Sequence, residues 1–266
     1  MRLLRFPEVS FSRLAQIGWV CIFTWCASQI LANATETNNT AVLLNKTFRE
    51  ARQKYLVETN SSVVAWQFSR ACFDLADAAT NNTQRADYAN QGIEAARRST
   101  TQDNGSVAAH YYLGMNIGQL AETKHNLSAL RLVKDMEREF LAARALDEHF
   151  DFAGPDRNLG LLYEQTPVIV SIGSRTKSRQ HLEKAVELAT DFPENQLNLI
   201  EAYLKWDYRT EATRQLDELE KIWPAAQKKF SGDPWAPSWA DWDKRRDSAK
   251  KKIGGNSKII EPPHSQ

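Results

Sequence analysis

The residues that most often catalyse reactions or bind metals are few and scattered in this chain of 266 residues. No two histidines lie four residues apart, and none stands in an H-E-x-x-H context, the spacing that places two imidazoles on one helix face. The sequence also lacks a G-x-S-x-G turn, a phosphate-binding glycine-rich loop and a Cys–His pairing. It therefore predicts no catalytic residue, no metal site and no cofactor. The histidines are His110, His125, His149, His181 and His264.

The charged residues are typical of solvated helix faces rather than of an active site. Lys184 and Glu187, like Glu218 and Lys221, are three residues apart, so each pair shares a helix face. Lys and Arg together number 34 against 33 Asp and Glu, which leaves no excess of positive charge to bind nucleic acid. These features predict a non-enzymatic protein with no nucleic-acid partner.

A sequence repeat near the C-terminal end, Gln196–Pro224, indicates that the chain is built from pairs of helices. Its spacing matches the tetratricopeptide (TPR) repeat, in which two antiparallel helices pack through Leu and Tyr on the first helix and small or bulky residues on the second. Repeats of this kind build a concave binding surface. The matching residues are Leu199, Tyr203, Ala212, Leu216, Leu219 and the closing Pro224.

The same pattern recurs twice upstream, each time with extra residues between the two helices. In the nearer copy, which begins near Asp156, Gly160 is expected to let the second helix approach closely. In the farther copy, Lys124–Ala129 is expected to separate the two helices. The residues in register are Leu159, Gly160, Tyr163, Ser178, Leu182 and Ala185 in one copy, and Leu113, Gly114, Ile117, Met136, Phe140 and Ala143 in the other.

A more degenerate unit and two flanking helices complete the predicted fold. Trp66 and Phe73 mark one helix of this first unit and Ile93 the other, and a further helix is predicted at Ala41–Val57. A last helix is predicted at Ser238–Ile253, capped by Ser238. The fold class is therefore all-α, a TPR-like α-solenoid of about four degenerate helix pairs with a capping helix at each end.

The N-terminus is typical of an export signal. Basic residues precede an uncharged apolar run over Ile17–Ala27, and Ala32-Asn33-Ala34 follows as a cleavage site. The alternatives are an uncleaved N-terminal anchor and lipidation at Cys21 or Cys26, which the bulky residues before each cysteine disfavour. The predicted domains are a signal peptide over 1–34, a linker over 35–40, a helical domain over 41–253 and a flexible tail over 254–266.

Three further features each leave two interpretations open. The apolar insertion Pro167–Gly173 either covers the edge of the solenoid or presents side chains to a ligand or a second subunit. The cluster of Trp235, Trp239 and Trp242 is better explained by packing of the last helix than by a partner-binding hot spot. The basic run Lys244–Lys252 is better explained as a solvated helix face than as a site for anionic lipid, and its contact with a membrane stays open.

Several of these segments resemble the T-component (TatT) family of TRAP transporters. The residues that carry the resemblance are Ala153 to Tyr163, Ser171 to Ser174, His181 to Leu188, Phe192 to Asn195 and the tract Gly118–Lys134. Regulator-of-microtubule-dynamics proteins look distantly similar in the same repeats. The TatT resemblance implies an exported, periplasmic helical protein that binds a TRAP-type solute-binding protein and assists solute uptake. It also implies self-association as a trimer.

We therefore expect a partner-binding surface lined by polar and aromatic residues of the first helices. The alternatives are a carrier that encloses a small apolar ligand, with the insertion as part of its wall, and a general envelope scaffold. The candidate groove residues are Asn116, Gln119, Asn158, Tyr163, Asn198 and Tyr203, and the candidate wall residues are Val168, Val170 and Ile172.

Overall fold

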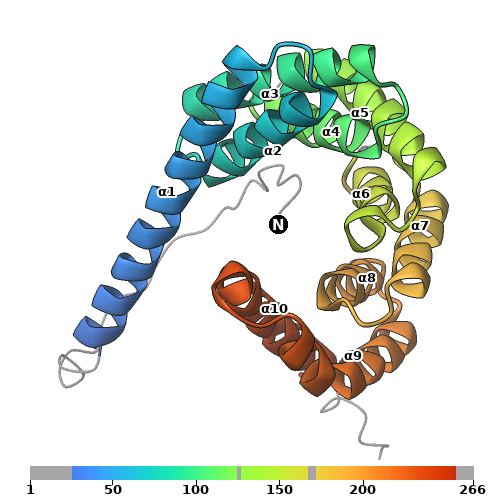
Figure 1. Cartoon of the computed structure of the whole chain (residues 1–266). Helices are drawn as coiled ribbons and strands as arrows, with labels where there is room; N and C mark the ends of the chain where they lie inside the picture. Colours follow the sequence, from blue (N-terminus) through green and yellow to red (C-terminus); the bar gives the residue numbers. More distant parts are fainter. Residues whose placement is uncertain (1–25, 125–126, 167–171, 256–266) are drawn as a thin grey trace, which may run out of the picture. The chain divides into compact units, whose positions relative to one another are not determined.

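The computed structural model describes residues 26–124, 127–166 and 172–255 (Figure 1). Within these ranges the chain forms ten α-helices and one short 3₁₀ helix, and no strand. None of the helices in this part of the chain has the length and apolar character to cross a membrane. The helices are α1 (Cys26–Val57), α2 (Ser62–Ala78), α3 (Asn82–Gln102), α4 (Val107–Glu122), α5 (Leu127–Leu146), α6 (Phe150–Gln165), α7 (Arg175–Leu188), α8 (Pro193–Lys205), α9 (Arg209–Lys229), η1 (Asp233–Trp235) and α10 (Ala236–Gly254).

The order of the helices confirms the predicted repeat architecture. Four consecutive pairs, α2–α3, α4–α5, α6–α7 and α8–α9, are flanked by α1 and α10. The helices divide between two compact units, an N-terminal unit that ends at Met136 and a C-terminal unit that begins at Glu137. The fold class is thus an all-α, TPR-like solenoid, and each unit is described by itself.

The N-terminal unit is built around α2, which packs against α1, α3 and α4. Phe68 and Cys72 are buried in its core, and Phe48 and Tyr55 of α1 cover this core from outside. Burial raises the pKa of the Cys72 thiol far above its usual range, which disfavours the reactive thiolate.

Side-chain caps fix where three helices of this unit begin. The hydroxyl oxygens of Ser61 and Ser106 accept from the first turns of α2 and α4, and the Asn81 side chain does the same for α3. The Ser and Asn residues in the connections therefore have a local structural role.

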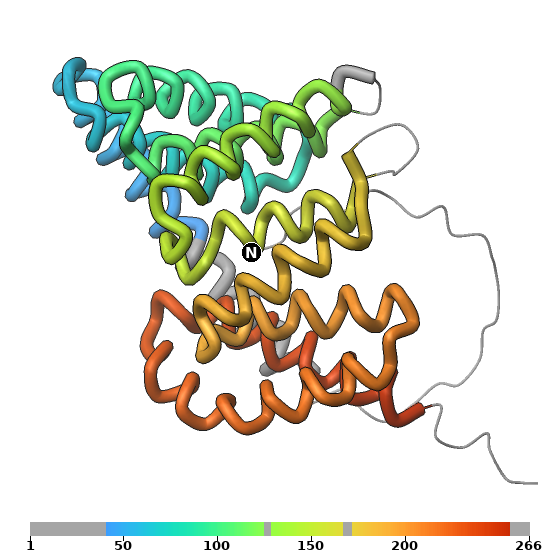
Figure 2. The backbone as a smooth tube through the Cα atoms, turned by 90° about the vertical axis from the view of Figure 1, so that its right-hand side faces the viewer, coloured from blue at the N-terminus to red at the C-terminus, as the bar shows by residue number. Residues whose placement is uncertain are grey.

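The C-terminal unit is a run of antiparallel helices in which each packs on its neighbour (Figure 2). α6 packs on α7, α7 on α8 and α8 on α9, and α10 then covers both α8 and α9, as the first helix of a following repeat would. One core cluster lies between α7, α8 and α9 around Tyr203. A second lies between α8, α9 and α10 around Trp223 and Trp242.

Several predicted boundaries differ from the observed ones. Pro224 does not close its repeat, because α9 continues through it to Lys229 and buries Trp223 and Ala226 on the same face. α10 begins at Ala236 rather than Ser238, with Trp235 at its N-cap position and no side-chain cap. Residues 35–40, predicted to be a linker, and the predicted cleavage site after Ala34 both lie within the range of α1.

The close approach predicted at Gly160 is present between α6 and α7. A Cβ atom at this position would lie 2.6 Å from Cγ of Leu182 and 3.1 Å from its backbone nitrogen. Leu182 is fully buried, so neither atom can move away easily.

Substitution of Gly160 tests this packing. Gly160→Ala should lower the free energy of unfolding by about 1–3 kcal/mol because α7 must shift outward. The measurement is urea unfolding followed by circular dichroism. Gly254→Ala is the matched control, since a Cβ atom at Gly254 meets nothing within 4 Å. Equal stabilities of the two variants would show that the two helices are not held this closely.

Candidate functional site

The polar residues predicted to line a groove in the N-terminal unit connect helices instead. The Asn116 side-chain amide donates to the backbone oxygen of Ser69 at 3.0 Å and to its hydroxyl at 3.1 Å, so it ties α4 to α2. Gln119 donates to Asp77, also on α2, at 3.1 Å. Both side chains are almost fully buried. In this unit the neighbouring first helix, α2, takes up their hydrogen bonds, so the two side chains are buried rather than exposed, and contact with a partner stays a prediction.

The two asparagines predicted in the C-terminal unit are buried as well. Asn158 of α6 lies within the core of its helix pair. Asn198 of α8 accepts a hydrogen bond from Arg245 of α10 at 2.6 Å. The last helix thus covers the face of α8 on which a partner was expected, and Asn198 contacts the chain's own C-terminal helix.

Tyr163 and Tyr203 are anchored between helices by a contact that repeats from one helix pair to the next. Each hydroxyl donates to a carboxylate of the preceding second helix at 2.6 Å, Tyr163 to Glu137 and Tyr203 to Glu183. Burial, and then the hydrogen-bonded carboxylate, raise the pKa of each phenol well above its usual range. A cation of α7 lies over each ring, Lys177 for Tyr163 and Arg179 for Tyr203. The two tyrosines are therefore packing residues, and both are almost fully buried.

The proposed wall of an apolar carrier cavity is only partly described. Val168 and Val170 lie outside the described residues, and Ile172 is half-buried. The carrier interpretation therefore gains no support from these three residues.

A buried carboxylate that the sequence pattern did not single out joins three helices. Asp156 of α6 is fully buried and accepts two hydrogen bonds from Arg144 of α5, at 2.9 and 3.0 Å. It also lies 2.6 Å from Nδ1 of His181 on α7. The sequence did carry one signal for this role: Asp156 directly follows Gly154-Pro155, near the start of a predicted helix. A carboxylate at that place is stabilised by the helix N-terminus.

A strained turn lies within the range of α6, at its start, and is braced by Arg157. Asp151, Phe152 and Ala153 have φ angles of 50°, 54° and 60°, in the left-handed region that costs non-glycine residues about 1–2 kcal/mol each. The Arg157 guanidinium donates to the backbone oxygens of Asp151 and Phe152 and to the side-chain oxygen of Asn195. These bonds hold the turn in a conformation that its residues would not adopt alone.

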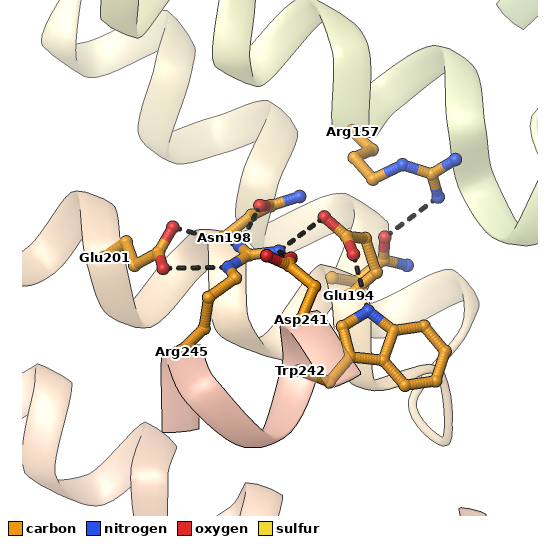
Figure 3. A network of polar contacts seen from close by, with 8 residues as sticks. Arg157, Glu194, Asn198, Glu201, Asp241, Trp242 and Arg245 are labelled. Carbon is orange, nitrogen blue, oxygen red and sulfur yellow. Dashed lines mark hydrogen bonds and ion pairs between the residues drawn. The ribbon is translucent and has the colours of Figure 1, made fainter. Parts of the chain in front are cut away.

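The densest polar network of the C-terminal unit joins α8 to α10 (Figure 3). Glu194, in the first turn of α8, accepts from Nη1 of Arg245 at 2.8 Å and from the indole nitrogen of Trp242 at 2.6 Å. The Arg245 guanidinium also forms a fork with both carboxylate oxygens of Glu201, at 2.8 and 2.9 Å. One buried arginine therefore neutralises a buried carboxylate and reaches a second, half-exposed one.

This arrangement determines the charge state of Glu194. Burial would raise the pKa of the carboxyl group, but the Arg245 charge and the hydrogen bonds from Arg245 and Trp242 outweigh it and lower the pKa from 4.5 to about 2. The pKa of Arg245 is raised in return, against the effect of its own burial. Both groups are thus charged at every physiological pH.

The tryptophan cluster packs the last helix, as expected, whereas the basic run, expected to be a solvated helix face, is partly packed against α8 and α9. Trp242 is buried in the core with α8 and α9, and Trp239 contacts Trp223 edge to face at 5.1 Å between ring centroids. Arg246 lies over the Trp223 ring at 4.2 Å, and Lys250 pairs with Glu220 of α9 at 2.8 Å. Much of the positive charge of Lys244–Lys252 therefore serves to hold α10 in place.

One pocket of the C-terminal unit lies at the C-terminal ends of its first helices. Tyr163 and Glu164 of α6, and Lys205 with Trp206 at the end of α8, meet Arg175 at the start of α7 around a pocket of about 220 Å³. Lys205 forms an ion pair with Glu164 and keeps an exposed side chain. Of the predicted residues, only Tyr163 lines this pocket. Among the described residues, no group of histidine, cysteine and carboxylate side chains is arranged to hold a metal ion.

Comparison with solved structures finds helical repeat proteins. A TPR protein of the thermophile Thermus thermophilus, TTC0263, superposes with a TM-score of 0.56 at 15% identity, over 82% of this chain and 98% of that one. A crystal structure of MamA gives a TM-score of 0.48 at 18% identity, over 71% of this chain and 94% of that one. The fold is TPR-like. At this level of identity the likeness concerns the fold alone, and neither match indicates an enzyme family.

Sequence comparison adds one partial match. A family model described as regulator of microtubule dynamics protein 1-3 matches residues 27–152, just under half of the chain. Comparison with curated proteins finds no match. The TatT resemblance stays a hypothesis that none of these comparisons supports.

A double-mutant cycle tests the link between α8 and α10. Arg245→Met should lower the free energy of unfolding by about 3 kcal/mol, because it leaves the buried Glu194 carboxylate without its cation. Glu194→Gln should cost less, because Arg245 keeps its fork with Glu201. The double variant should lose clearly less stability than the sum of the two single losses.

Urea unfolding gives the free energies, and hydrogen exchange of the α10 amides shows whether this helix is released. Lys221→Met, at an exposed ion pair, is the control and should cost under about 1 kcal/mol. Strict additivity of the two losses would contradict the link.

The same pair predicts an acid-sensitive step. Since the pKa of Glu194 is lowered by folding, its contribution to stability is complete above about pH 4.5 and is lost as the pH falls toward about 2. The stability of the unmodified protein, measured by urea unfolding across this range, should fall more steeply than that of Glu194→Gln. Parallel pH profiles for the two proteins would show that Glu194 does not titrate as described.

Proposed function

We propose that this protein is a non-catalytic scaffold that binds another protein through its TPR-like repeats. The observation that carries the proposal is the repeat architecture, four helix pairs with a covering helix at each end, which superposes on a TPR protein along most of both chains. Folds of this kind stack first helices beside one another and thereby offer an extended surface to a partner.

The part of that surface we assign to binding is the accessible end of the first helices in the C-terminal unit. The middle of α8 is covered by α10 through Arg245, whereas Lys205 at its end is exposed. The pocket beside Lys205 is lined by charged side chains and two aromatic rings, so it suits a polar segment of a protein better than an apolar small molecule. This favours a scaffold over a ligand carrier.

For the identity of the partner, our first candidate is a TRAP-type solute-binding protein in the periplasm, with this chain as an exported accessory of uptake, itself a trimer. It is supported only by the resemblance of Ala153 to Asn195 to the TatT family, and most of the residues of that tract discussed above are buried. A second candidate, a partner related to microtubule dynamics, is supported by the family match over residues 27–152.

Crosslinked capture of the tagged chain from its native cells, followed by mass spectrometry, tests both candidates. A solute-binding protein among the crosslinked products would support the first, and tubulin or a microtubule-associated protein the second. Recovery of no protein beyond the chain itself would overturn the scaffold function.

A matched pair of charge reversals tests the assigned surface. Lys205→Glu should reduce capture of the partner about tenfold or more, because it places a carboxylate beside Glu164 at the end of the first helices. Lys221→Glu, on the second helix α9, is the control: it has a similarly exposed side chain, 67% against 60%, and is likewise paired with one glutamate. Both variants should keep the fold, as circular dichroism would show. Equal capture by the two variants would place the binding surface elsewhere.

A further inference from the structure

The pocket of the C-terminal unit has an unbalanced set of hydrogen-bonding groups. It is bounded by the ends of α6 and α8 and the start of α7. The Glu164 carboxylate, its one acidic group, is already paired with Lys205. The Tyr163 hydroxyl is likewise engaged, since it donates to Glu137. The acceptors in the pocket are therefore largely in use.

Among the described residues, two hydrogen-bond donors of the same pocket have no acceptor. The Arg175 guanidinium lies 5.8 Å from the ring centroid of Tyr208, and within the described ranges it forms no hydrogen bond or ion pair. The indole N–H of Trp206 likewise has no acceptor in the part of the chain that the structure describes. Arginine presents its donors in a planar fork that matches a carboxylate.

Charge and size narrow the class of ligand further. Two cations against one carboxylate leave the pocket with an excess positive charge. Its volume of about 220 Å³ is below the range of about 300–1,000 Å³ typical of small-molecule sites. The pocket can therefore accept a single acidic group flanked by apolar atoms, which the rings of Tyr163 and Trp206 would contact.

We propose that this pocket binds a carboxylate carried by a peptide segment of the protein partner. The carboxylate belongs either to an aspartate or glutamate side chain or to the C-terminus of the partner chain. The Arg175 fork and the Trp206 indole N–H donate to it, and Lys205 adds charge. This inference rests on the proposed scaffold function and specifies what the surface recognises.

Direct titration with short peptides tests the proposal on the full chain. The probes are three N-acetylated alanine peptides: one with an internal Glu and an amidated end, one with Gln and a free C-terminus, and one with Gln and an amidated end. The readout is the Trp206 indole signal in a ¹⁵N-correlated spectrum, assigned by its loss in Trp206→Phe. At least one carboxylate peptide should shift this signal at millimolar concentration, and the neutral peptide should not. The peptide that acts identifies the source of the carboxylate.

A matched pair of arginine substitutions decides whether Arg175 is responsible. Arg175→Gln should weaken binding of the active peptide about tenfold or more, because a hydrogen-bonded charge is lost. Arg97→Gln, at an exposed arginine of α3 in the other unit, should leave it unchanged. The proposal is overturned if neither carboxylate peptide shifts the Trp206 signal, if the neutral peptide shifts it equally, or if both substitutions weaken binding to the same extent.

The two levels of the proposal fail separately. If the chain captures a protein partner but no peptide moves the Trp206 signal, the scaffold function stands and the carboxylate pocket is wrong. If a carboxylate peptide binds but no partner is captured, the pocket is real and the scaffold function has to be given up.

Discussion

The C-terminal unit depends on how it accommodates the negative charge of Glu194 in its interior. A carboxylate removed from water is costly unless a cation and hydrogen-bond donors replace the solvent. Arg245 and Trp242 supply both, and they come from the last helix, α10. The first turn of α8 and the end of the helical array are therefore one energetic unit, and neither is satisfied without the other.

The same logic recurs through the unit. Asp156 is paired with Arg144 and lies 2.6 Å from Nδ1 of His181, and Arg157 braces the left-handed turn at the start of α6. The tyrosines of the first helices are tied to carboxylates of the preceding second helices. Each first helix thus uses its polar residues to bind its neighbours, in addition to its apolar contacts. These hydrogen bonds and ion pairs fix how each helix packs against its neighbours.

This use of polar residues has a consequence for function. Since Asn158 and Asn198 are buried, they are not exposed to a partner, and the surface that we propose for binding lies instead at the ends of the first helices. The segment that resembles the TatT family, around Asp156 and Arg157, contains many residues that build the fold. A resemblance carried by such residues is informative about architecture and much less so about the partner.

The sequence alone determined the helix pairs, the buried small and apolar residues such as Leu182 and Ala185, and the close approach at Gly160. These follow from periodicity and residue size, which are local properties. It did not determine the direction in which the polar side chains of the first helices point. Asn116 and Asn198 were assigned to a groove by their register, but only the tertiary structure shows that α2 and α10 take up their hydrogen bonds. The pocket around Arg175 was likewise unforeseeable, because it brings together three chain segments whose separation in the sequence says nothing of their proximity in space. Burial of a polar group is decided by its neighbours, and those neighbours come from distant parts of the chain.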